Sequence, residues 1–308
     1  LYDENVKFYI NKKKMGNWVV HFAFKNDNIY KYSCDFLNLR DDRGRGGHTS
    51  NEILKRVDNI ISQHTNKDNS EYIDENVVSF ISSFTNGTVH GYASIWEYII
   101  YYIKNNLKSK IILSTMTQSG MVEIVSHIFG RTNIIFLKPN MMYNIKNITF
   151  IPLNYMHFTD IFWTDVDPFL KNHIINDTFN SDIKKIAIMK TNSTTNCTGT
   201  GIMDSRKVNE FCKKNRLYNL IPSKHNEIET ANLIYNCDIF VCSWGTAYYK
   251  NIRYIGDNCK YIYVFIQKGF IPQYNSRKNR PDSHVYKKYK NAVVKYIVIN
   301  KDITSFVI

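Results

Sequence analysis

Two segments in the second half of the chain combine residue types that hold phosphate groups. The first runs from Lys190 to Glu210: an apolar stretch leads into a polar loop with Gly199 and Gly201, and a helix start follows at Arg206. Glycine lets the backbone approach a ligand closely, while the lysine and the arginine add positive charge. Such a loop before a helix N-terminus suits a diphosphate.

The same segment has a second interpretation, as a surface loop whose helix is capped by Asp204 and Ser205. Its glycine spacing, TGTGIMD, differs from the G-x-G-x-x-G fingerprint of dinucleotide sites. Neither NAD nor FAD is therefore indicated, and no cofactor is expected. The choice between a ligand loop and a capped surface loop stays open from sequence.

The second segment, DIFVCSWGTAYYKN at residues 238–251, reads as an apolar strand that stops at a turn and continues as a helix. The turn holds Ser243, Trp244, Gly245 and Thr246. In open α/β sheets, ligands sit at the carboxyl ends of strands, where loops meet helix N-termini. We therefore expect this tip to border a ligand.

Both segments lie in a regular alternation of strands and helices, which is typical of parallel sheets covered by helices. The alternation pauses at residues 156–179, so we place a domain boundary there. We expect an α/β fold of two Rossmann-like domains that face a cleft, residues 1–170 and 171–308. The expected strands are 76–82, 110–115, 133–139, 147–154, 184–190, 218–222, 238–244 and 260–266. The expected helices are 119–130, 204–215, 227–237 and 246–256, and at 87–106 a loop leads into a further helix. Before them, residues 17–37 alternate like paired strands and residues 49–64 have helical spacing.

Composition indicates a folded protein, since 44% of the 308 residues are hydrophobic. The net charge of +13 is spread along the chain, and no helix-turn-helix, zinc or RNP signature accompanies it, so a nucleic-acid partner is not expected. No apolar run is long enough to span a membrane. The chain opens at Leu1 rather than Met, which leaves room for a leader or anchor upstream.

The six cysteines form no C-x-x-C pair, which favours reduced, buried thiols in a cytoplasmic protein and speaks against a structural zinc site. The many Lys, Asn, Ile and Tyr residues are typical of an AT-rich coding genome, such as that of a large DNA virus or an AT-rich microbe. A viral protein of the host cytoplasm or the virion fits this composition.

The order of these motifs resembles the family 61 glycosyltransferases. In the second half, SRKVNE at residues 205–210 is similar to the family's Arg-Arg-x-x-Asn-Glu stretch, and the strand tip at Gly245 follows about as far along the chain as the family's His-Gly-Ala turn. In the first half, GTVHGYASIWEYIIYYI places His90 where the family has an aromatic-rich stretch with a histidine at a helix start. The resemblance covers roughly residues 77–263.

Three positions depart from the family pattern. Ser94 stands where the family has Asp, Trp244 replaces the strand-tip His, and Lys190 replaces an Arg. These differences concern the donor and the catalytic base more than the fold. A glycan-binding relative without activity is therefore an open alternative.

The resemblance implies an inverting, metal-independent GT-B enzyme that moves a sugar from a nucleotide-sugar donor, expected to be UDP-linked, to a glycan or protein hydroxyl. It assigns the diphosphate to Lys190, Arg206 and the helix that begins at Thr246. On this reading Ser243 and Thr246 contact phosphate or ribose, and Trp244 lines the base or sugar pocket.

Inversion requires a general base for the acceptor hydroxyl. The resemblance nominates His90, because imidazole titrates near neutral pH, with Glu97 on the same helix as second candidate. Glu227 and Glu229 open the helix before the strand tip; helix capping is their default role and ribose contact the alternative.

A competing reading is a GT-A enzyme that holds manganese and diphosphate with a D-x-D triplet, here Asp165 and Asp167. Such triplets are common by chance, and Pro168 follows at once, so no metal site is our expectation. A basic nucleic-acid-binding protein without catalysis is the alternative outside enzymology.

Overall fold

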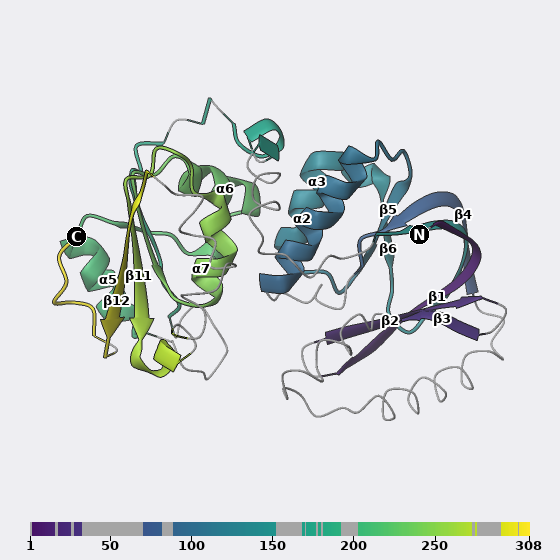
Figure 1. Ribbon diagram of the computed structural model, residues 1–308, viewed down its shortest axis with the longest axis horizontal. Coiled ribbons are helices and arrows are strands. Elements are labelled where there is room, and N and C mark those ends of the chain that lie inside the picture. The colour runs from purple at the N-terminus through teal and green to yellow at the C-terminus, as the bar shows by residue number, and fades with distance from the viewer. Residues whose placement is uncertain are drawn as a thin grey trace. The chain divides into compact units, whose positions relative to one another are not determined.

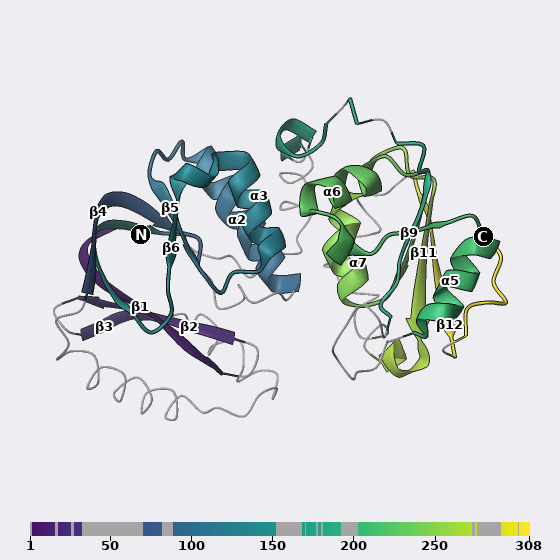
Figure 2. The same ribbon diagram turned by 180° about the vertical axis from the view of Figure 1, so that it is seen from behind.

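A computed structural model describes residues 2–15, 18–25, 28–32, 70–81, 89–151, 168–169, 171–176, 178–179, 181–191, 203–272, 275, 291–300 and 302–308. By its contacts the chain divides into two compact units, Leu1–Asn154 and Tyr155–Ile308 (Figures 1 and 2). The boundary expected between residues 170 and 171 falls inside the second unit. The helix expected at 49–64 lies outside the described residues.

The first unit contains a mixed sheet of seven strands in the order β3-β2-β1-β7-β4-β5-β6. Strands β1, β2 and β3 are antiparallel, β1 is also antiparallel to β7, and the pairs β7–β4, β4–β5 and β5–β6 are parallel. The paired strands expected in residues 17–37 are β2 and β3, and they extend the same sheet. The strand bounds are β1 Tyr2–Met15, β2 Trp18–Lys25, β3 Asn28–Tyr32, β4 Ser70–Ser79, β5 Lys110–Ser114, β6 Ile134–Leu137 and β7 Met142–Phe150.

The sheet curls around its own hydrophobic core. Val6, Phe8 and Ile10 alternate along β1 and are at most 1% exposed, so one face of that strand is buried. Ala23 of β2 and Leu137 of β6 come from far-apart positions in the strand order, yet they belong to the same core cluster. Figure 1 shows β1 and β4 as strongly bent ribbons, which is how distant strands reach a common core.

Two helices cover the parallel part of this sheet, α2 (Val89–Lys104) and α3 (Ser119–Phe129). Ile95 and Ile99 of α2 are fully buried at i, i+4 spacing, which is the periodicity that predicted the helix. Helix α3 ends, as expected, at Gly130, whose φ of 80° favours glycine. A 3-10 turn at Arg131–Asn133 leads into β6.

The second unit contains a fully parallel sheet in the order β9-β8-β10-β11-β12. Helix α5 covers one face, and α6 and α7 cover the other (Figures 1 and 2). The bounds are β8 Lys185–Ile188, α5 Ser205–Lys214, β9 Tyr218–Asn219, α6 Glu227–Tyr235, β10 Ile239–Ser243, α7 Thr246–Asn251, β11 Tyr261–Gln267 and β12 Val293–Ile299, with 3-10 turns at Pro222–Lys224, Ile252–Tyr254 and Lys268–Phe270.

The C-terminal segment closes the α5 face of this sheet. Ile303 is fully buried in the core cluster that contains Phe211 of α5 and Phe265 of β11. The Nδ2 atom of Asn215, just after α5, donates to the carbonyl of Phe306 at 3.1 Å. The end of the chain is therefore part of the domain core.

The α/β class is thus confirmed, with two sheets rich in parallel pairs. None of the described helices is long and apolar enough to cross a bilayer. Among these residues no group of three His, Cys, Asp or Glu side chains is placed to hold a metal ion. The four cysteines in the described part of the chain are free and buried, and burial raises the pKa of the Cys212 thiol to about 12.

Candidate functional site

The strand order of the second unit reverses between β8 and β10. From β8 the chain moves outward to β9, and then returns past β8 to β10, β11 and β12. Helix α5 lies on one face and α6 on the other because the two crossovers run in opposite directions. In doubly wound sheets, ligands bind outside the carboxyl ends of the strands at such a reversal. The ends of β8 and β10 are therefore the first place to look for a site.

Two residues predicted from sequence meet at this point. The backbone N–H of Lys190 donates to Oγ of Ser243 at 3.0 Å, although the two residues are 53 positions apart. The carbonyl of Lys190 accepts from the N–H of Met203 at 2.9 Å, so its peptide groups are held from both sides. Ser243 is 2% exposed and Lys190 is half-buried. The lysine is thereby fixed at the strand reversal through its backbone.

Trp244 anchors the tip of β10 in the core. Its backbone N–H donates to the carbonyl of Phe265 at 2.9 Å. Its ring stacks on Tyr248 with centroids 5.0 Å apart, and the edge of Tyr296 packs against it at 6.1 Å. Only 6% of the residue is exposed. The ring therefore holds α7 and β12 to the tip, which leaves little of it to line a base or sugar pocket.

Gly245 has a backbone conformation that few other residues adopt, with φ 108° and ψ −140°. A Cβ atom built on it would meet no atom within 4 Å. The glycine is thus required by the turn, and the space beside it is open to a ligand. Thr246 begins α7 directly afterwards, and its side chain lies outside the described residues.

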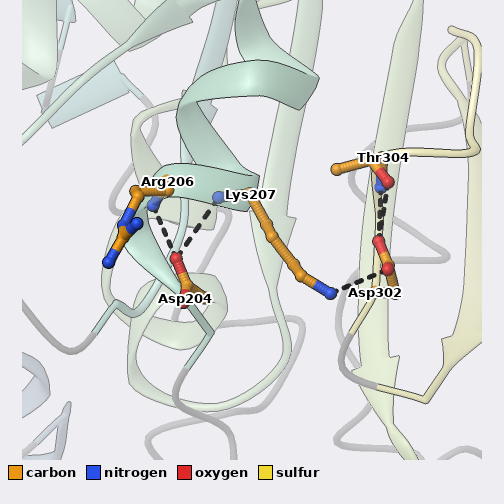
Figure 3. Close-up of polar contacts among 5 residues, drawn as sticks. All are labelled: Asp204, Arg206, Lys207, Asp302 and Thr304. Atoms are coloured by element: carbon orange, nitrogen blue, oxygen red, sulfur yellow. Dashed lines mark hydrogen bonds and ion pairs between the residues drawn. The ribbon is translucent and has the colours of Figure 1, made fainter.

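The start of α5 is closed by its own chain. The carboxylate of Asp204 accepts from the N–H of Arg206 at 2.8 Å and from that of Lys207 at 3.4 Å (Figure 3). A phosphate at this helix end would meet that negative charge. The structure therefore shows the capped helix, the alternative that the sequence left open. The loop with Gly199 and Gly201 lies outside the described residues.

The side chains beside this cap face solvent. Arg206 is exposed. Lys207 donates to Asp302 at 2.8 Å, which fastens α5 to the C-terminal segment (Figure 3). That hydrogen bond, with further bonds from Thr304, holds the pKa of the Asp302 carboxyl well below its usual range.

A buried ion pair joins the two helices behind the tip of β10. Glu227, 6% exposed in the first turn of α6, accepts from Nζ of Lys250 at 2.7 Å and from the hydroxyl of Tyr254 at 2.9 Å. The cap of α6 is Asn226, whose Oδ1 accepts from the N–H of Glu229 at 2.7 Å. Glu227 therefore ties α6 to α7 instead of capping its helix. Sequence reasoning missed Lys250 and Tyr254, because partners 23 and 27 residues away leave no local pattern.

The candidates for proton transfer from the sequence lie in the first unit. His90 is the second residue of α2, and its side chain lies outside the described residues. Glu97 is half-buried on the same helix, and its Oε2 atom is shielded from solvent. Ser94, where the resemblance expects Asp, is fully buried. Asp165 and Asp167 fall outside the described part of the chain.

The second unit is thus a doubly wound parallel domain whose strand reversal holds Lys190, Ser243 and an open glycine turn. No protein-family model matches the chain, and no curated protein matches it.

Proposed function

We propose that the chain is a glycosyltransferase of the two-domain GT-B type that takes its sugar from a nucleotide-sugar donor, with UDP as the expected nucleotide. The observation that supports this most is the meeting of Lys190 and Ser243 at the strand reversal of the second sheet. A doubly wound sheet with a cation and an open glycine turn at that point is suited to a nucleoside diphosphate. The resemblance to family 61 supplies the sugar and the transfer reaction.

In this proposal the diphosphate lies against the end of β8 and the turn at Gly245. The ammonium group of Lys190 offsets the charge that develops on the departing diphosphate. Trp244 keeps the turn in place through its contacts with Tyr248 and Tyr296. The ion pair of Glu227 with Lys250 holds α6 to α7 behind it. Arg206 has a smaller role than the sequence suggested, since it is exposed beside a capped helix end.

The transfer itself needs a group that takes the proton from the acceptor hydroxyl of a glycan or protein, because the hydroxyl attacks the anomeric carbon from the side opposite the diphosphate. The resemblance nominates His90, with Glu97 as second candidate. It also implies inversion without a metal ion. The free, buried cysteines fit a cytoplasmic place of action, such as that of a virus-infected cell.

Calorimetric titration with UDP, GDP and CMP tests the donor half of this proposal. We expect the wild type to bind one of them. Lys190→Met should weaken that binding about 10- to 100-fold, the usual effect of losing a hydrogen bond to a charged group. Lys260→Met is the matched control, because Lys260 is exposed just before β11, at the opposite end of the sheet. Failure of all three nucleotides to bind at millimolar concentration contradicts the proposal.

A further inference from the structure

Three side chains outside the strand reversal form a connected chain of hydrogen bonds. Tyr218 belongs to β9, His225 precedes α6, and Glu229 lies in the first turn of α6. The Tyr218 hydroxyl lies 3.2 Å from Nε2 of His225, and Nδ1 of His225 lies 2.9 Å from Oε1 of Glu229. The phenol and imidazole rings meet edge to face, with centroids 6.2 Å apart.

The direction of both hydrogen bonds among these three side chains is defined. An ionised carboxylate can only accept, so Nδ1 of His225 carries a hydrogen toward Glu229. The neutral imidazole then has its lone pair on Nε2, where it accepts from the Tyr218 hydroxyl. This is the arrangement in which a carboxylate orients an imidazole as a proton acceptor and stabilises the imidazolium that forms.

The exposure of the three residues fits passage of a proton. Tyr218 is 37% exposed, whereas the His225 side chain is 17% exposed. The tyrosine is therefore more accessible to a ligand than the imidazole. The Glu229 side chain is 42% exposed, so solvent can take the proton from the other end.

We propose that Tyr218, His225 and Glu229 are a proton relay that deprotonates a hydroxyl-bearing ligand, and we call them the Tyr218 relay. The ligand proton moves to the Tyr218 oxygen while the Tyr218 proton moves to Nε2 of His225. The ligand oxygen keeps the electron pair with which it attacks an electrophilic carbon. Tyr218 is the catalytic residue, His225 takes the proton, and Glu229 positions His225.

The identity of that hydroxyl rests on the proposed function. In glycosyl transfer the ligand is the acceptor, a glycan or protein alcohol. Its oxygen forms the new bond to the anomeric carbon as the bond from that carbon to the phosphate oxygen breaks. The electron pair of the broken bond leaves with the nucleoside diphosphate. The relay thus takes the proton for which the resemblance nominates His90.

Tyrosine acylation tests the relay without any transferase assay. N-acetylimidazole transfers its acetyl group to a tyrosine oxygen, and peptide mass spectrometry gives the rate at each tyrosine. Tyr261 is the internal control: it is 40% exposed on the same sheet, and its ring stacks on the phenol ring of Tyr263. We expect Tyr218 to react about tenfold or more faster than Tyr261, because a positioned proton acceptor speeds such steps about 100- to 10,000-fold in enzymes.

Two variants test whether the faster acylation of Tyr218 depends on His225. His225→Gln should lower the rate at Tyr218 to that at Tyr261, while His127→Gln, at an exposed site on α3, should change neither rate. Equal rates at Tyr218 and Tyr261 in the folded wild type would overturn the relay.

The kinetics of sugar transfer then test whether the Tyr218 relay takes part in the reaction. His225→Gln should lower kcat about 100- to 10,000-fold with nucleotide affinity unchanged, and His127→Gln should stay near wild type. Full activity in His225→Gln with an inactive His90→Ala would overturn the relay in favour of α2. If the wild type transfers no sugar from any donor, the proposed function fails, and the acylation rates alone decide whether the relay exists.

Discussion

The two strand-to-helix segments that carry the phosphate hypothesis differ in one physical respect. At the start of α5, the carboxylate of Asp204 already occupies the N–H groups of Arg206 and Lys207. At the tip of β10, a Cβ atom built on Gly245 would meet no atom within 4 Å. A helix start near positive residues is an anion site only if the chain does not supply the anion itself. The comparison therefore favours the tip of β10 over the start of α5.

The largest expected effect is the loss of stability when the ion pair between Glu227 and Lys250, which joins α6 to α7, is broken. Lys250→Met leaves the Glu227 carboxylate buried without its ammonium partner, which typically costs about 3–5 kcal/mol. Urea denaturation measures the loss. Lys171→Met is the matched control: its pair with Asp257 is exposed on both sides, and its loss should cost less than about 1 kcal/mol. Equal losses in the two variants would show that the buried pair does not hold the tip.

Gly245→Ala should have an intermediate effect. The φ of 108° and ψ of −140° cost a residue with a Cβ about 1–3 kcal/mol, although no neighbouring atom obstructs it. The strained turn should also weaken nucleotide binding about tenfold. Gly130→Ala, at φ 80° in the first unit, should lower stability without changing binding. Unchanged nucleotide affinity in Gly245→Ala would remove the turn from the site.

Asp204→Ala, at the start of α5, should have the smallest effect. Loss of the helix cap costs about 1 kcal/mol, measured by urea denaturation. Nucleotide affinity should stay within about twofold of wild type, because the proposed diphosphate site lies elsewhere. A tenfold change in affinity would show that the start of α5 belongs to the site after all.

The sequence predicted most of the second unit because its elements are short, apolar and separated by turn residues. It also placed Lys190 and Ser243 at strand ends, and parallel strands bring such ends together. It did not predict β1, whose strand contains the charged run Lys12–Lys14. The mixed character of the first sheet follows from β1, which pairs antiparallel with β7.

The features of the candidate site that the sequence did not predict depend on contacts between distant segments. The local sequence does not decide which anion, the Asp204 carboxylate or a phosphate, accepts hydrogen bonds from the N–H groups at the start of α5. The burial of Trp244 depends on Tyr296, which lies 52 residues further along the chain at a contact that only the folded sheet creates. His225 and Glu229 do have the i, i+4 spacing of a helical pair, but Tyr218 completes their relay from another strand.

Amide chemical shifts on titration with UDP, or with whichever nucleotide binds in calorimetry, show which residues the nucleotide contacts. We expect the largest shifts on Lys190, Ser243 and Gly245, at the strand reversal. We expect small shifts for Arg206 and Lys207, whose N–H groups remain bonded to Asp204. Largest shifts at Arg206 and Lys207, or no shifts in the second unit, would contradict a nucleotide site at the tip of β10.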